Sequence, residues 1–241
     1  MRDALCASEP GVGLVIQMVV LCLLALSAWL VLRVGRVSLW QQAYFGLGAY
    51  CAALLTTVFG WSLAAALLVA VLFGGLSAVL FSAPVLRLPG VHFALATLAL
   101  AEVVRLALSG WRWQVPLPSG QLAGPDGVQG FRDIRWLFDH QWGQTEYMYL
   151  CLALLGGVLV LLAWLTRTRL GLAMQAIGHD ALLAENQGWP VYAIRCRVSA
   201  LAGALAALAG GLYAHQLTYL EPAIFDPMLG IHARSEEHTS E

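Results

Sequence analysis

Two long stretches without a charged residue constrain the fold of this 241-residue chain more than any other feature. Residues 10–32 and residues 37–86 contain no Asp, Glu, Lys or Arg. About 20 apolar residues span a bilayer as a helix, so the first stretch has room for one crossing and the second for two. Only 11% of all residues are charged, against about 25% in soluble domains. The sequence therefore predicts an all-α, polytopic helical membrane protein.

We expect about six membrane segments, over residues 11–32, 38–59, 62–86, 91–108, 146–165 and 198–220. The fourth is short for a full span, and a broken or partial helix is the alternative. Residues 109–145 form the one long polar segment. The last helix has two rows of small residues, which let helices approach closely in lipid, and we expect both rows to face neighbouring helices. The rows are Gly203, Ala207, Gly211 and Ala202, Ala206, Gly210.

The arginines predict the orientation of these segments, because short cytoplasmic loops are rich in Arg and Lys. All 13 basic residues are Arg. Arg167, Arg169, Arg195 and Arg197 flank the loop over residues 166–197, which we place in the cytoplasm. Alternation then places residues 109–145 and the N-terminus outside. It also brings Arg33, Arg36 and Arg87 to the cytoplasmic side.

Several function classes are disfavoured by motifs that the sequence lacks. It has no P-loop GxxxxGK[ST] for ATP binding and no basic cluster with interleaved aromatics for nucleic acid. The five cysteines form no CxxC pair, and the histidines have no metal-ligand spacing. No catalytic residue, metal or cofactor is therefore predicted. An ion-coupled transporter would place more ionisable residues in its helices.

The loop over residues 166–197 contains signals for a short helix of its own. Gly178 interrupts helical structure, Asp180 can cap a helix N-terminus, and residues 181–187 favour helix. Gly188 can end that helix, and Pro190 can open the next one. Two interpretations remain open: a rigid docking element for a separate ATPase subunit, or an amphipathic helix that rests on lipid headgroups.

Five blocks of sequence, in the same order, resemble one family. They are residues 37–50 (Val-Ser-Leu-Trp-Gln-Gln-Ala-Tyr-Phe-Gly-Leu-Gly-Ala-Tyr), 86–90 with 94–105, 122–128, 171–192 running into 199–214, and 221–227. Together they resemble branched-chain amino acid ABC transporter permeases, specifically the M-type subunit of the Liv system. The resemblance covers about residues 30–230. The chain departs from the family pattern at Trp40, at Pro89 and at residues 178–180.

The resemblance implies an ABC importer permease architecture and a role without enzymatic activity. ATP would be hydrolysed by separate ATPase subunits, and a second permease would complete a heterodimer in the bacterial inner membrane. A periplasmic binding protein would deliver a branched-chain or related amino acid. An ABC permease for a sugar or urea-like amide, or an ion-coupled secondary transporter, is the alternative. The residues implied in ATPase coupling are Asp180, Ala181, Leu182, Ala184, Glu185 and Gly188.

Polar side chains within the apolar segments are candidates for a translocation path. Gln41, Gln42, Tyr44 and Thr97 are uncharged; each is either a substrate contact or an interhelical hydrogen bond. Glu102 and Arg105 are three residues apart and can pair on one helical face. A charge at mid-membrane costs about 2.5–3.5 kcal/mol. The pair therefore indicates either a polar support beside the path or a position near the interface that orients the helix.

The C-terminal octapeptide, residues 234–241, differs abruptly from what precedes it. It reads Arg-Ser-Glu-Glu-His-Thr-Ser-Glu and resembles the conceptual translation of a sequencing adapter. We expect residues 1–233 to form one transmembrane permease domain that is incomplete at its C-terminus, and residues 234–241 to be non-native. A genuine solvated tail is the alternative.

Overall fold

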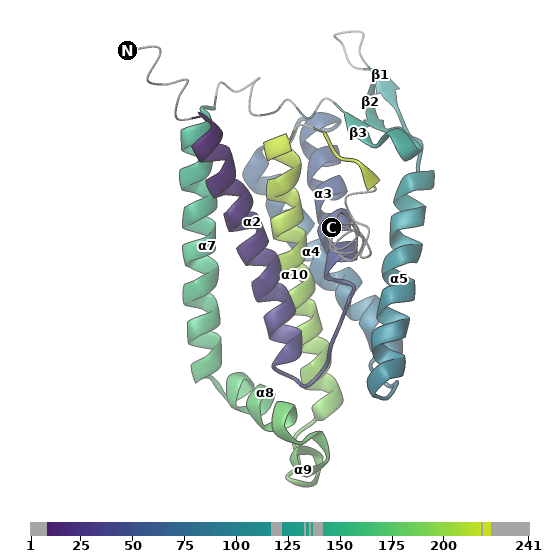
Figure 1. Ribbon diagram of the computed structural model, residues 1–241, viewed down its shortest axis with the longest axis vertical. Coiled ribbons are helices and arrows are strands. Elements are labelled where there is room, and N and C mark those ends of the chain that lie inside the picture. The colour runs from purple at the N-terminus through teal and green to yellow at the C-terminus, as the bar shows by residue number, and fades with distance from the viewer. Residues whose placement is uncertain are drawn as a thin grey trace, which may run out of the picture.

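The computed structural model describes residues 9–116, 122–132, 134, 136, 142–217 and 219–222. The predictions about a missing C-terminal part and a non-native tail concern residues outside this set. Within it, the chain is a bundle of long, roughly antiparallel helices, with a small sheet at one end and two short helices at the other (Figure 1). We call these the sheet end and the α8–α9 end.

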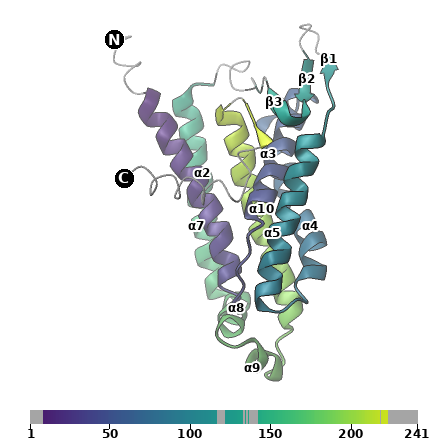
Figure 2. The same ribbon diagram turned by 45° about the vertical axis from the view of Figure 1, so that its right-hand side comes forward.

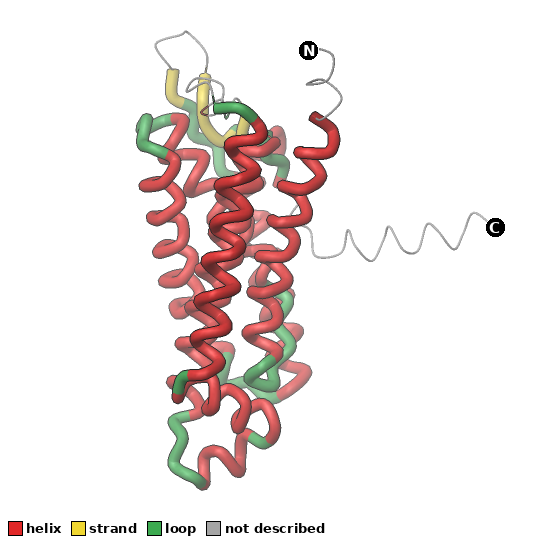
Figure 3. Tube along the Cα trace, turned by 90° about the vertical axis from the view of Figure 1, so that its left-hand side faces the viewer, coloured by secondary structure: helices red, strands yellow, loops and turns green. Residues whose placement is uncertain are grey.

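Helices dominate the described residues, which confirms the predicted all-α class. Five helices are long and apolar enough to cross a membrane, and α3 is a sixth, shorter one of 17 residues. The predicted count of about six therefore holds. The long helices are α2 (Glu9–Leu32), α3 (Gln41–Thr57), α4 (Leu63–Val85), α5 (Gly90–Gly110), α7 (Gln144–Arg167) and α10 (Val191–Leu217). The trace in Figure 3 shows them side by side.

Helix α10 lies at the centre of the bundle, packed between α2, α3 and α4 (Figure 2). Its small residues allow this, as predicted. A Cβ added to Gly203 would lie 2.7 Å from the carbonyl oxygen of Gly74 in α4, and one added to Gly74 would lie 2.8 Å from that of Gly203. On the α3 side, a Cβ on Gly210 would overlap the backbone of Phe45. The backbone of α10 therefore meets the backbones of α3 and α4 with no side chain larger than an alanine methyl group at these contacts.

Buried hydrogen bonds also connect α10 to its neighbours. The Ser27 hydroxyl of α2 donates to the Ala202 carbonyl at 2.8 Å, and the Tyr147 hydroxyl of α7 donates to the Leu212 carbonyl at 2.6 Å. In α10 itself, His215 Nδ1 lies 2.7 Å from the Gly211 carbonyl, so this nitrogen carries the proton. His215 Nε2, 3.0 Å from Thr56 Oγ1 of α3, then accepts from that hydroxyl.

The sheet end holds three short antiparallel strands in the order β1 (Val115–Pro116), β2 (Leu122–Pro125) and β3 (Phe131–Arg132). The 3-10 helix η1 (Gly127–Gln129) joins β2 to β3. Phe131 also pairs with Leu220, just beyond α10, through bonds of 2.8 and 2.9 Å. The sequence predicted a long polar segment here and no strands, because strands of two to four residues leave too short an alternation to detect.

The fourth predicted segment, residues 91–108, is confirmed as one continuous helix of 21 residues, α5, long enough for a full span, and not as the broken or partial helix of the alternative. Two other expectations about element bounds were wrong. The last helix begins at Val191 rather than at residue 198 and ends at Leu217. Gly178 does not interrupt helical structure, because it lies inside α8 (Arg169–His179), a helix that the sequence analysis missed. The helix α9 (Ala181–Asn186) follows it directly.

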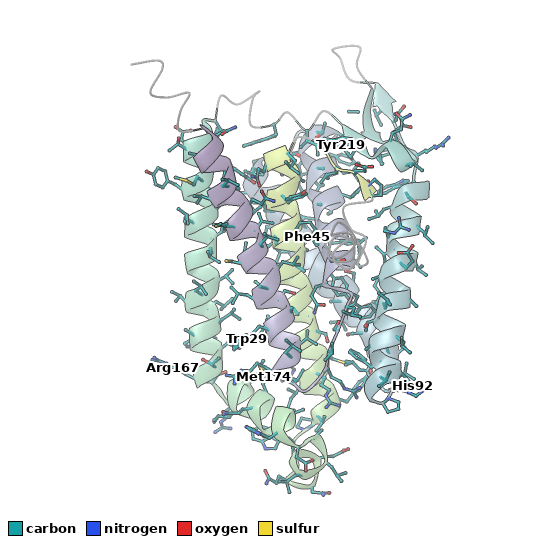
Figure 4. All side chains as sticks on the ribbon, viewed as in Figure 1. Trp29, Phe45, His92, Arg167, Met174 and Tyr219 are labelled. Atoms are coloured by element: carbon teal, nitrogen blue, oxygen red, sulfur yellow. The ribbon has the colours of Figure 1, made fainter. Side chains whose placement is uncertain are left out.

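The seven arginines that were predicted to share one side of the membrane do lie at one end. They flank the α8–α9 end: Arg33 and Arg36 follow α2, Arg87 follows α4, Arg167 and Arg169 join α7 to α8, and Arg195 and Arg197 lie in the first turns of α10. Figure 4 shows Arg167 and His92 at this end and Tyr219 at the other. That this end faces the cytoplasm stays a prediction.

Candidate functional site

The short helix predicted in the loop is present as α9, and its N-terminus is capped as expected. The Asp180 carboxylate accepts hydrogen bonds from the backbone N–H groups of Leu182 at 2.9 Å and Leu183 at 3.0 Å. Gly188, with φ +87°, lies just after the helix, in a left-handed conformation that favours glycine. Pro190 then immediately precedes α10. Local sequence therefore fixes both ends of α9.

The two faces of α9 differ sharply in burial. Ala184 is buried, at 2% exposure, against the rest of the α8–α9 end, whereas Leu182 and Leu183 are 71% and 56% exposed. Glu185 is also exposed. Two large apolar side chains thus project from a short, anchored helix at an Arg-rich end of the molecule. Such a surface fits either a protein groove or the boundary of a membrane.

Helix α8 joins this surface to the bundle. Its buried residues are spaced for one helical face that packs against the core: Gly171, Ala173, Met174 and Ile177. At its C-terminal end, Gly178 contacts the chain that follows α2. A Cβ on Gly178 would overlap the Arg33 carbonyl oxygen and lie 3.3 Å from the Arg33 carbonyl carbon. The close contact with the Arg33 backbone explains why a glycine occupies this position of the helix.

The segment of residues 33–40, here called the α2–α3 connection, runs back along the bundle from the end of α2 to the start of α3 (Figure 1). Its backbone N–H at Leu39 donates to the Thr97 hydroxyl at 3.3 Å. Thr97 lies seven residues inside α5, about 10 Å along the helix axis. The connection is only partly covered by protein: Val37 and Leu39 are 58% and 44% exposed, whereas Trp40 at its end is buried against Tyr44 and Phe81.

Three buried side-chain oxygens near the start of α3 have no hydrogen-bond partner among the described residues. They belong to Ser38, Gln42 and Tyr44. A buried polar atom without a partner costs about 1–3 kcal/mol, and native structures contain few of them. Two of the predicted path residues, Gln42 and Tyr44, thus have unused hydrogen-bonding capacity in the first turn of α3, where the third, Gln41, is also buried. We call residues 38–44 the polar turn.

Thr97 lies against the polar turn, as the Leu39 contact shows, and its hydroxyl donates to the Ala94 carbonyl at 2.7 Å. Glu102 and Arg105 lie farther along α5 and pair with each other, with Arg105 Nε donating to Glu102 Oε2 at 2.9 Å. Both side chains are partly exposed. The structure therefore brings Thr97 to the polar turn and leaves the charged pair on α5.

Sequence reasoning missed Arg36, which spans the gap between two connections. Its guanidinium donates to the Leu88 carbonyl at 2.7 Å and the Leu86 carbonyl at 3.4 Å, and it lies 5.0 Å from the centre of the Phe93 ring. Burial lowers the pKa of Arg36, but arginine stays protonated in proteins. A permanent charge therefore ties the α2–α3 connection to the junction of α4 and α5.

Two apolar cavities lie elsewhere in the bundle. One, of about 510 Å³, is lined mainly by α4 and α7 with Leu208 of α10. The other, of about 620 Å³, lies between α2 and α7. None of the predicted path residues lines either cavity. Their apolar walls suit packing against lipid or further helices rather than passage of a polar solute.

These features define a class of protein: a multi-pass helical membrane protein with a small anchored helix at its Arg-rich end. Comparisons with known proteins identify the family. A family model described as "Branched-chain amino acid transport system / permease component" matches residues 12–234. The chain belongs to this family.

Two curated proteins illustrate the relationship. Each is named high-affinity branched-chain amino acid transport system permease protein LivM, one from Escherichia coli K12 and one from Salmonella typhimurium LT2. Each is 28% identical over 207 residues, which is 79% of this chain and 49% of the relative. The chain thus spans about half the length of the curated relatives it matches. No solved structure matches it significantly.

Proposed function

We propose that the chain is part of the membrane-spanning permease subunit of an ATP-driven importer in a bacterial inner membrane. It would pass branched-chain or related amino acids from a periplasmic binding protein to the cytoplasm. Membership of the permease family and the printed function of the LivM relatives support this proposal. Separate ATPase subunits would hydrolyse ATP, and a second permease would complete the pathway.

The observation that carries the coupling role is the exposure of Leu182 and Leu183 on a capped, anchored helix. ATPase subunits would bind α9 through Asp180, Ala181, Leu182, Ala184, Glu185 and Gly188. Buried Ala184 and the Asp180 cap would hold the helix in place, while Leu182 would enter a groove of the ATPase. Glu185 would contribute a charged contact at the edge of that groove.

The polar turn is the proposed lining of the translocation path. Gln41, Gln42 and Tyr44 contribute polar groups in a buried stretch of α3, and Thr97 faces the same stretch from α5. A permease that is fed by a binding protein needs only a weak site, so a few unpaired groups suffice. Glu102 and Arg105 would support this path from farther along α5.

Uptake of labelled leucine by the full-length gene product tests the proposal. The permease would be expressed with its binding protein and second permease, and with either an active ATPase or one that cannot hydrolyse ATP. We expect uptake only with the active ATPase, and competition by unlabelled valine but not by a sugar or urea. Uptake that does not need the ATPase would indicate an ion-coupled transporter. Competition by a sugar or an amide alone would indicate another solute.

Glu102→Ala should lower uptake without lowering membrane insertion.

The docking surface has a test of its own. Leu182→Ser should reduce co-purification of the ATPase with the permease, because an apolar contact of the docking surface is lost. Leu172, which is 58% exposed on α8, provides the matched control, and Leu172→Ser should leave co-purification unchanged. Equal co-purification of both variants would favour the lipid-headgroup interpretation of α9.

A further inference from the structure

The α2–α3 connection contacts the end of α8, next to the proposed docking helix α9, and it reaches the proposed path. At its start, Arg33 and Gly35 pack against Gly178 at the end of α8, two residues before α9 begins with its Asp180 cap. At its end, Leu39 bonds to Thr97 and the chain continues into the polar turn. The connection therefore runs from the end of α8 directly into the polar turn, whose first residue is Ser38.

The contact with α8 is between backbones. A Cβ on Gly35 would lie 3.4 Å from the carbonyl oxygen of Gly178 and 3.7 Å from that of Ile177. Gly35 has φ +69°, a backbone conformation that residues with a Cβ rarely adopt. Because no side chain lies between the two segments, there is no rotamer that could absorb a displacement of α8. A shift of α8 therefore moves the start of the connection directly.

Arg36 prevents the connection from moving independently of α4 and α5. Its two hydrogen bonds reach carbonyl groups at the end of α4, at Leu86 and Leu88. From the other side, the Tyr192 hydroxyl of α10 donates to the Ala83 carbonyl of α4 at 2.9 Å, and Arg87 lies 5.8 Å from the Tyr192 ring. The α2–α3 connection and the first turn of α10 are thus both attached to the same end of α4.

We propose that the α2–α3 connection transmits movement of the α8–α9 end to the polar turn, with Gly178 as its contact and Arg36 as its attachment to α4. This inference rests on the proposed function. Gly35, Arg36 and Gly178 are positioning residues that touch no solute. When an ATPase displaces α9, the connection shifts the first turn of α3 relative to Thr97 and changes access to the path.

The experiment uses the full-length permease complex, reconstituted with its ATPase, second permease and binding protein. Both ATP hydrolysis and solute uptake are measured. Gly178→Ala and Arg36→Gln should each lower uptake at least about fivefold, the lower end of the coupling between distant sites, while ATP hydrolysis stays within about twofold of the wild type. Such uncoupling is not expected from a loss of folded protein, which lowers both rates together.

Each variant has a matched control. Gln175→Ala changes an exposed residue of α8. Arg33→Gln removes the same charge from the connection, but the Arg33 guanidinium only lies over the Trp29 ring at 4.9 Å. Both controls should keep uptake and hydrolysis coupled. Unchanged uptake in Gly178→Ala and Arg36→Gln, or a parallel fall in both rates, would overturn the inference while wild-type uptake upholds the proposed function. A wild-type complex without ATP-dependent uptake would overturn both.

Discussion

At the scale of single residues, the helical glycines have two kinds of surroundings. Gly210 lies in the centre of the bundle, where an added Cβ would be 2.8 Å from the Phe45 carbonyl carbon and 3.0 Å from the Ala49 nitrogen. Gly156 lies on α7, and no described atom outside its own stretch of helix lies within 4 Å of such a Cβ. The same substitution should therefore have opposite effects at the two positions.

We expect Gly210→Ala to lower the free energy of unfolding by about 1–3 kcal/mol, because overpacking forces the backbones of α3 and α10 apart. Gly156→Ala should raise it by up to about 1 kcal/mol, the difference in helix propensity. Thermal unfolding of the purified protein in detergent measures both. A stabilised Gly210→Ala variant would contradict the close packing of α3 on α10.

Two buried tyrosines allow the unpaired oxygens of the polar turn to be tested. The Tyr44 hydroxyl has no hydrogen-bond partner among the described residues, whereas Tyr147 donates to Leu212. Tyr147→Phe should lower the free energy of unfolding by about 1–3 kcal/mol, because the Leu212 carbonyl loses its side-chain donor. Tyr44→Phe should leave stability unchanged or higher.

Because Tyr44→Phe removes no protein hydrogen bond, any loss of uptake in that variant would report a role in the path. Protein level and leucine uptake are measured together for both variants. A large loss of stability in Tyr44→Phe would show that its hydroxyl is bonded after all, and the polar turn would then lose one of its three unpaired groups.

At the scale of elements, the stability of α9 depends strongly on the Asp180 side chain that caps it. A six-residue helix is far too short to form alone, so its cap and its packing determine its population. Asp180→Ala removes both cap bonds at a cost of about 0.5–2 kcal/mol, whereas Asn is an equally good cap. Hydrogen exchange over residues 181–186 should accelerate in Asp180→Ala and stay near wild type in Asp180→Asn. Equal exchange in both variants would show that packing alone holds α9.

Predictions at this scale succeeded where a local signal existed. The apolar runs located five of the six long helices to within a few residues of their observed ends. The signals at Asp180, Gly188 and Pro190 located α9. The errors have a common cause. Helix α8 is rich in helix-forming Leu, Ala and Met, but it contains Gly171 and Gly178. Each glycine suggests a break unless its close backbone contact is known, at Thr166 for Gly171 and at Arg33 for Gly178.

At the scale of the whole molecule, the arginine-rich α8–α9 end and the sheet end lie at opposite ends of the helix bundle. Exposed Gln187 lies just beyond α9, and Val128, 72% exposed, lies in η1 at the opposite end. In a background without native cysteines, Gln187→Cys should react with a membrane-impermeant thiol reagent only from the cytoplasmic side, because arginine-rich loops remain inside. Val128→Cys should react only from the outside. Labelling of both from the same side would contradict the topology.

The sequence by itself determined the membrane class, the approximate spans, the cap of α9 and the small-residue face of α10, because each depends on residues close together in the chain. Only the tertiary structure decided that α10 lies at the centre, that α3 begins inside the bundle, and that the polar turn lies against Thr97. It alone revealed Arg36 and the contact of Gly35 with Gly178. Those contacts join residues 50 or more positions apart, and no local pattern encodes which distant backbone a glycine or a guanidinium will meet.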